Sequence, residues 1–287
     1  MSFYVLSLVL IAAILHAVWN FLAKKAKGKA PFVWLMYIAS TIIYLPILIY
    51  RINQGAIIYS KPVLWLSLSS AVLHIAYFLI LQKGYKSGDL SVVYPLARGT
   101  GPLFSSIAAI LFLHELLKVR TTLGLVLILA GVFVITGLSF KKNNNTKLLT
   151  GVFWGALTGL FIALYTFNDT VAIKTYSVSP LIITFVSNIF SVVLMTPFVI
   201  TQRQEIKKEI NQHKWIIAGI GLLSPAAYIL VLQALKFAPL TVVAPARETS
   251  ILLGVFMGSR VLNEADGKRR IIASVLILVG IILLSLS

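Results

Sequence analysis

The sequence predicts an all-α integral membrane protein with ten transmembrane helices, arranged as two inverted five-helix repeats. Three observations lead to this fold class. Hydrophobic residues make up 59% of the 287 positions and charged residues only 11%, too little polar surface for a water-soluble globule of this length. Apolar stretches of about 20 residues, enough to cross about 30 Å of hydrocarbon, alternate with short charged clusters. The second half of the chain also repeats the first.

The repeat is clearest near the end of each half. Between residues 111–132 and the segment 149 positions later, eight of 22 residues are identical, including the run 126–129 against 275–278. Duplications of this kind are the ground plan of many membrane carriers. We therefore expect a first domain over residues 1–140 and a second over residues 148–287.

Each copy accommodates five membrane crossings, separated by charged clusters. Prolines near the starts of the second, third and seventh spans lie where a missing N–H is harmless. Interior prolines in the second, seventh and eighth spans predict bends. The ten expected spans are 2–23, 31–51, 62–84, 90–114, 119–140, 148–173, 179–201, 214–236, 240–262 and 269–286.

Two features predict how the helices pack. Gly151, Gly155 and Gly159 recur every fourth residue in the sixth span, and such a stripe lets another backbone approach closely. The fifth and tenth spans are the plainest apolar segments. We expect them to face lipid or to form a contact in a homodimer.

The net charge of +17 does not indicate nucleic-acid binding, because no connection is long enough to form a solvated basic domain. The five odd-numbered connections contain 17 Lys and Arg residues, and the four even-numbered ones contain six. This bias places the odd connections in the cytoplasm and both termini on the extracytoplasmic side. Because each half has an odd number of helices, the second copy is inverted.

Charged side chains within the spans are the first candidate site. Arg98 lies in a segment of the fourth span that also contains Pro95 and Pro102, and Arg247 lies in the ninth. An Arg at a helix centre costs about 2.5 to 3.5 kcal/mol on insertion scales, so both should point into the bundle. They either bind an anionic group of a substrate or serve as structural charges. Glu248 is a candidate for proton coupling or for a structural ion pair.

A second candidate site lies in the first span. His16, Trp19 and Asn20 are spaced to share one helix face, where they offer hydrogen bonds and a stacking plane to a solute. Asn168 and Asp169, near the end of the sixth span, are interpreted as a helix cap rather than as cavity groups. Weaker candidates for substrate binding are His74, Tyr77 and Tyr228.

The sequence shows no pattern typical of an enzyme. It contains no Cys, which excludes disulfides and thiolate nucleophiles. It also has no His pair at metal spacing, no phosphate loop and no Ser–His–Asp arrangement. We expect no catalytic residues, no metal and no cofactor.

The order of segments resembles the EamA-type branch of the drug/metabolite transporter superfamily, over essentially the whole chain. The chain departs from the usual Gly-Glu at the helix end, with His114-Glu115 and Asn263-Glu264. The resemblance implies a central cavity lined by the first, third, fourth, sixth, eighth and ninth helices, which opens alternately to each side. The residues that carry it are Pro95, Glu115, Gly124, Leu127, Ile128 and Gly131, and again Pro245, Glu264, Ala273, Leu276, Ile277 and Gly280.

The expected function is that of a secondary transporter in a bacterial inner (plasma) membrane. The segment His16 to Asn20 is similar to the first-helix signature of a bacterial subset, some of whose members are associated with phosphonate use. Together with the two arginines, this favours an organic anion, exported by alternating access. One alternative is an exporter of neutral or aromatic amino acids, drugs or other amphipaths, with structural arginines. Another is a non-transporting membrane protein.

Overall fold

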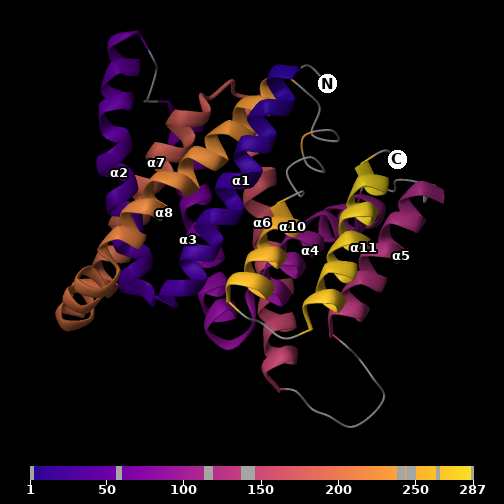
Figure 1. Ribbon diagram of the computed structural model, residues 1–287. Helices are drawn as coiled ribbons and strands as arrows, with labels where there is room; N and C mark the ends of the chain where they lie inside the picture. The colour runs from indigo at the N-terminus through magenta and orange to yellow at the C-terminus, as the bar shows by residue number, and fades with distance from the viewer. Residues whose placement is uncertain are drawn as a thin grey trace.

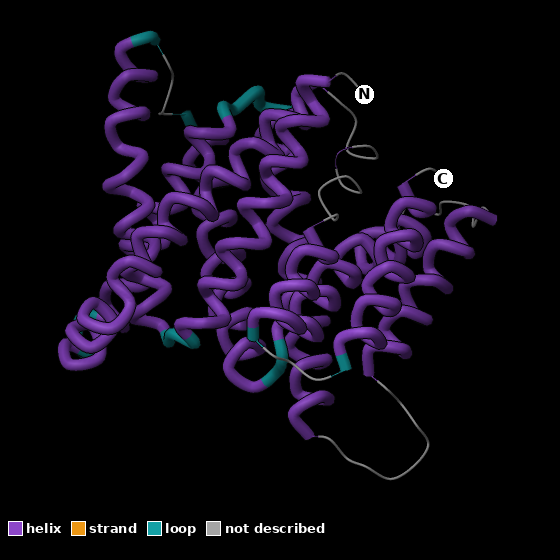
Figure 2. The backbone as a smooth tube through the Cα atoms, in the orientation of Figure 1, coloured by secondary structure: helices purple, strands orange, loops and turns teal. Residues whose placement is uncertain are grey.

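The computed structural model describes residues 3–55, 60–112, 119–136, 146–237, 243, 250–262 and 266–285. Within these ranges the regular structure is helical, and short loops join the helices (Figure 2). The first half contains α1 (Phe3–Ala26), α2 (Ala30–Asn53), α3 (Lys61–Ser87), α4 (Leu90–Phe112) and α5 (Val119–Thr136). The second half contains α6 (Thr146–Lys174), α7 (Pro180–Val199), α8 (Arg203–Phe237), α10 (Ser250–Phe256), the π-helical turn η1 (Met257–Val261) and α11 (Gly267–Ser285).

Six of the described helices, α1, α2, α3, α6, α7 and α8, are long and apolar enough to cross a membrane. This agrees with the expected membrane class. The full set of ten crossings goes beyond these six helices and stays a prediction.

The described helix pairs repeat symmetrically between the two halves. The α1–α8 contact has its counterpart in α6–α3, the α2–α8 contact in α7–α3, and the α4–α6 contact in α10–α1. Equivalent helices also pair directly, as α5 with α11, α2 with α7 and α4 with α10. Figure 1 shows that α1 begins at the end of the bundle where α11 ends, whereas α6 begins at the opposite end. The two halves therefore run in opposite directions through the bundle, as in inverted repeats.

The glycine stripe of α6 packs against the backbone of α4, as its spacing predicts. A Cβ atom on Gly155 would lie 3.1 Å from the carbonyl oxygen of Val93, and one on Gly159 would lie 2.8 Å from that of Ala97. Both helices therefore approach more closely than any side chain at these positions allows.

The fifth and tenth spans were expected to face lipid or a second copy of the chain. One face of each helix does neither, because α5 and α11 pack against each other within the chain. A Cβ on Gly131 would lie 2.7 Å from the carbonyl oxygen of Ala273, and one on Gly280 would lie 2.7 Å from that of Gly124. The two glycines hold equivalent positions in the repeats. The outer faces expose large apolar side chains, including Leu123, Val126, Leu129, Ile272, Val275 and Val279.

The eighth helix begins earlier than predicted. Its first residue is Arg203 rather than residue 214, and it runs for 35 residues. Residues 203–214 contain neither Gly nor Pro, and His213 Nδ1 lies 2.7 Å from the Glu209 carboxylate one turn earlier. Low hydropathy marks where a chain leaves the hydrocarbon, whereas a helix continues as long as its backbone can hydrogen-bond. The charged residues therefore extend the helix rather than end it.

An ion-pair cluster joins the two halves beside the short loop between α3 and α4. Asp89 lies 2.8 Å from Arg270 at the start of α11 and 2.7 Å from Lys147 at the start of α6. Arg270 also donates a hydrogen bond to Ser91. Partial burial raises the pKa of Asp89, but the hydrogen bonds and charges of Lys147 and Arg270 outweigh it, so the pKa lies below its ordinary value of 3.8.

Candidate functional site: a cavity between the two halves

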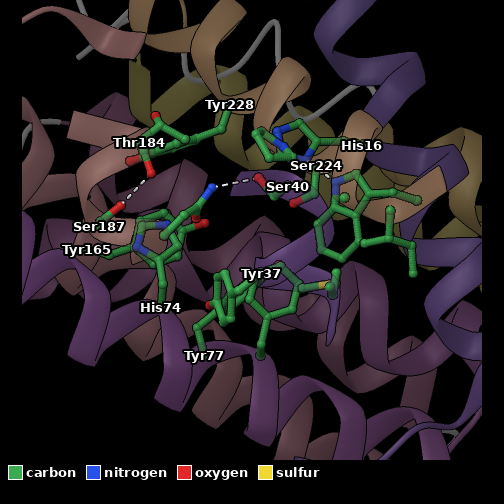
Figure 3. Close-up of a pocket in the computed structure, with 17 residues that line it drawn as sticks. His16, Tyr37, Ser40, His74, Tyr77, Tyr165, Thr184, Ser187, Ser224 and Tyr228 are labelled. Carbon is green, nitrogen blue, oxygen red and sulfur yellow. Dashed lines mark hydrogen bonds between the residues drawn. The ribbon is translucent and has the colours of Figure 1, made fainter. Parts of the chain in front are cut away.

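A cavity lies between the two halves (Figure 3), and its empty space, counted together with the space open to solvent, is about 560 Å³. Helices α1, α2 and α3 form its wall from the first half, and α6, α7 and α8 from the second. Its aromatic lining consists of Trp19, Tyr37, Tyr77, Phe78, Tyr165 and Tyr228. Its polar lining consists of His16, Ser40, His74, Thr184, Ser187, Asn188 and Ser224. Such an apolar space with a few convergent polar groups is typical of small-molecule sites.

His16 lines the cavity and is held by two donors. Its Nδ1 atom lies 3.0 Å from Trp19 Nε1 and 2.9 Å from Arg98 Nη2. Indole and guanidinium nitrogens only donate hydrogen bonds, so Nδ1 is the acceptor and a neutral His16 carries its proton on Nε2. The hydrogen bonds from Trp19 and Arg98 therefore fix the ring orientation and the tautomer of His16.

Arg98 itself is not among the described residues that line the cavity. Its side chain is 2% exposed, contacts His16, and lies with its guanidinium carbon 5.7 Å from the ring centre of Tyr94. It points into the bundle, as its insertion cost predicts. Arg98 therefore lies behind the cavity wall, in contact with the lining residue His16.

Asn20 braces the first helix rather than lining the cavity. Its Nδ2 atom donates to the carbonyl oxygen of His16 at 2.7 Å, and its Oδ1 atom accepts from the hydroxyl of Tyr85 at 2.6 Å. The other two expected members of this face, His16 and Trp19, do line the cavity.

His74, Tyr77 and Tyr228 all lie in the cavity wall, so the structure brings together the weaker candidates of the sequence analysis. The imidazole of His74 stacks on the ring of Tyr165, with centroids 4.1 Å apart and planes at 26°. Tyr77 and Tyr228 each meet Tyr165 edge to face, at 5.3 and 5.7 Å. One continuous aromatic surface thus crosses from the first half to the second.

Asp169 was interpreted from sequence as part of a helix cap, and this interpretation is wrong. Helix α6 continues to Lys174, and Asp169 is fully buried. Its carboxylate accepts hydrogen bonds from Tyr228 and Ser70. Asp169 therefore supports the cavity wall from behind, through its hydrogen bond with Tyr228.

The sequence analysis missed the contribution of α2 and α7. In α7 the polar residues Thr184, Ser187, Asn188 and Ser191 are spaced three and four apart and are all buried. Asn188 Nδ2 donates to Ser40 Oγ of α2 at 2.7 Å, across the boundary between the halves. This polar stripe in an otherwise apolar span is visible in the sequence and was a usable signal.

Two expected site residues, Arg247 and Glu248, lie outside the described residues. No group of three or more His, Cys, Asp or Glu able to hold a metal ion occurs within the described ranges.

Comparison with known proteins gives three findings. The model of the EamA-like transporter family matches residues 3–137 and again residues 149–286. The uncharacterized protein MJ1333.1 of Methanocaldococcus jannaschii is 34% identical over 128 residues, which cover 44% of this chain and 92% of that protein. One solved crystal structure of a protein superposes with a TM-score of 0.61 at 13% identity and covers 98% of both chains. At this identity the likeness shows the fold alone.

Proposed function

Because the chain belongs to the EamA-like transporter family, a family of membrane transporters, we propose that it is a secondary carrier that moves a small amphipathic solute by alternating access. The observation that carries the proposal is the cavity whose walls come from both halves of the bundle. Rocking one half against the other would expose such a space to each side in turn. The family and the apolar helices make the chain an integral membrane protein.

The lining favours a solute with an aromatic or apolar body and a small polar group. Six aromatic rings face the space, and no Lys, Arg, Asp or Glu is among the described residues that line it. Aromatic walls supply a large apolar contact area and edge-to-face stacking. The hydroxyls and the amide of α2 and α7 can then orient the polar group. Neutral or aromatic amino acids and similar amphipaths fit this chemistry.

An organic anion is the second candidate, and one contact favours it. Arg98 donates a hydrogen bond to His16, which lies in the wall. Only the imidazole of His16 would therefore separate the positive charge from a bound solute. The Nε2–H of His16 would be the donor to a carboxylate, phosphate or phosphonate. In this alternative Arg98 acts on the anion through His16.

The excess of Lys and Arg in the odd-numbered connections supports an orientation with both termini outside the cytoplasm. Export across a bacterial plasma membrane is the direction that the resemblance to this branch implies. The proposal also includes the two domains, 1–140 and 148–287, as the moving halves.

A head-group series tests the substrate class. The purified protein is heated with 2-phenylethanol, L-phenylalanine, phenethylamine or phenylphosphonate, which share a ring and differ in charge. A ligand that binds the folded state raises the melting temperature in proportion to ln(1 + [L]/Kd). The proposal expects the alcohol or the amino acid to stabilise most, and Tyr165→Ala to abolish the effect. Greatest stabilisation by phenylphosphonate would favour the anion.

Flux decides whether the chain is a carrier at all. The same four compounds are measured for counterflow in proteoliposomes that contain only this protein. Counterflow of any stabilising compound supports the proposal. Binding without flux would identify a non-transporting membrane protein instead.

A further inference from the structure

Behind the cavity wall lies a buried acid that the transport proposal has not used. Asp169 is fully buried within α6, one of the helices able to cross the membrane. A carboxylate buried within a membrane-spanning helix is costly and usually has a functional role. Its Oδ2 atom accepts from Tyr228 Oη at 2.7 Å and from Ser70 Oγ at 3.1 Å. Its Oδ1 atom accepts from Asn168 Nδ2 at 2.8 Å.

His74 is joined to this acid through one hydroxyl. The Nδ1 atom of His74 lies 2.9 Å from the carbonyl oxygen of Ser70, which can only accept, so Nδ1 carries a hydrogen. The same atom lies 3.1 Å from Ser70 Oγ, whose own hydrogen is directed to Asp169. A continuous chain therefore runs from His74 Nδ1–H through the Ser70 hydroxyl to Asp169 Oδ2. The ring's other nitrogen, Nε2, belongs to a residue that lines the cavity.

The groups around the acid are otherwise neutral. Helices α3 and α8 present Ser70, His74 and Tyr228, and α6 itself presents Tyr165 and Asn168. Helix α7 lines the same cavity with the uncharged Thr184, Ser187 and Asn188. The cation on α4 is Arg98, which contacts His16 and Tyr94. No described Lys or Arg forms an ion pair with Asp169, so a proton is the charge that can neutralise it locally.

We propose that His74, Ser70 and Asp169 form a proton-binding site that couples proton movement to transport; this rests on the proposed carrier function. A proton from the cavity forms an N–H bond at His74 Nε2, and the proton on Nδ1 passes to Ser70 Oγ. The Ser70 hydroxyl proton passes at the same time to Asp169 Oδ2. The carboxylate becomes a carboxylic acid, and His74 ends neutral in its other tautomer. Asp169 then donates to Ser70, which donates to His74 Nδ1.

The position of the site links protonation to the change of access. Ser70 and His74 belong to the first half, whereas Asp169 and Tyr228 belong to the second, so the hydrogen bond from Ser70 to Asp169 crosses the boundary that must move. Protonation turns the carboxylate from a pure acceptor into a donor and changes this link. Tyr228, a direct partner of the acid, and His74, which reaches it through Ser70, both line the cavity, so a bound solute would contact both.

Infrared titration tests the site without any ligand. The full chain in lipid is acidified stepwise, and the absorption of protonated carboxyl groups is followed. The sequence contains only three aspartates, Asp89, Asp169 and Asp266. We expect a band that ¹³C-aspartate labelling shifts, that Asp169→Asn removes and that Asp266→Asn retains. If no aspartate band in unsubstituted protein grows on acidification, the proposal is overturned, whether or not the variant folds.

A transport measurement separates coupling from the carrier function, with L-phenylalanine as the probe. For exchange of one proton per solute, the wild type should accumulate the probe about tenfold per unit of pH gradient. Asp169→Asn should lose this accumulation. Wild-type counterflow that is indifferent to the gradient overturns the proton site and leaves the carrier function intact. Absence of counterflow with all compounds of the head-group series would contradict the carrier function, while the infrared band still decides whether the acid binds a proton.

Discussion

His16 Nδ1 lies 2.9 Å from Arg98 Nη2, which joins a residue of the cavity wall on α1 to a buried cation on α4. Because the guanidinium can only donate, this contact makes Nδ1 the acceptor and places the hydrogen of the neutral ring on Nε2. Arg98, which lies outside the cavity wall, thus sets the tautomer of His16, which lies in the wall. The same contact gives the buried guanidinium an internal acceptor within the bundle.

Arg98→Ala should reduce transport by roughly ten- to hundredfold, because a hydrogen bond from a charged donor contributes about 1.5 to 3 kcal/mol and His16 loses its fixed orientation. Counterflow in proteoliposomes measures the effect. The matched control is Arg260→Ala, which removes an exposed arginine of η1 and should leave the rate unchanged. Normal transport by Arg98→Ala would remove this residue from the site.

The Asn188–Ser40 hydrogen bond should link the two halves energetically. Asn188→Ala and Ser40→Ala are each expected to lower the free energy of unfolding, and a double-mutant cycle should give a coupling of about 0.5 to 1.5 kcal/mol. Chemical denaturation in mild detergent provides the measurement. Additive losses would show that the 2.7 Å contact contributes nothing of its own. A control pair without mutual contact is Thr41→Ala with Thr170→Ala, whose hydroxyls bond within their own helices.

Gly131→Ala and Gly280→Ala should each destabilise the α5–α11 pair by about 1 to 3 kcal/mol, the usual cost of forcing extra atoms into a packed interface. In both cases the new methyl group would meet a carbonyl oxygen at 2.7 Å. Thermal unfolding is the measurement. Gly219→Ala is the control, because its Cβ would meet only Leu22 Cδ1, at 3.4 Å. Equal melting temperatures for all three variants would refute the close approach.

The Asp89 cluster should make stability depend on pH in the acid range. The pKa of Asp89 is lowered in the folded state, so its contribution is fully present above the ordinary value of 3.8 and is lost as the pH falls through the lowered pKa. Asp89→Asn should therefore lower the melting temperature at neutral pH by a few degrees, since about 1 kcal/mol corresponds to about 2–4 °C. The difference from wild type should vanish at low pH.

Two comparisons check the origin of that effect. Lys147→Gln should show a similar but weaker pH dependence, because Asp89 retains Arg270. Asp266→Asn removes an exposed pair with Arg269 and should change the melting temperature little, since surface pairs contribute about 0–1 kcal/mol. A difference between Asp89→Asn and wild type that is constant with pH would contradict the ion-pair account.

Much of the candidate site could be predicted from helical spacing alone. His16 and Trp19 share a face of α1, and His74 and Tyr77 are three residues apart on α3, and all four line the cavity. Spacing along one helix fixes which side chains point the same way. It cannot say which helices stand opposite, so α2 and α7 were missed although the polar stripe of α7 is visible in the sequence.

The error at Asp169 has the same physical origin. Counting residues from a span's end suggested a cap, because hydropathy gives the depth of a residue and not its neighbours. Only packing brings Ser70 of α3 and Tyr228 of α8, which are 99 and 59 positions away, to the same carboxylate. The early start of α8 at Arg203 shows the complementary limit, since polarity marks the edge of the hydrocarbon rather than the end of a helix.

The sequence by itself determined that this chain is a membrane protein and that it contains two related halves, because hydropathy and duplication can both be read along the chain. The charge bias predicts that the halves are inverted. Only the tertiary structure decided that Arg98 stands behind His16 rather than in the cavity, and that Asp169 meets His74 through Ser70. Such contacts depend on distances of about 3 Å between helices far apart in the chain. No pattern within a single helix contains that information.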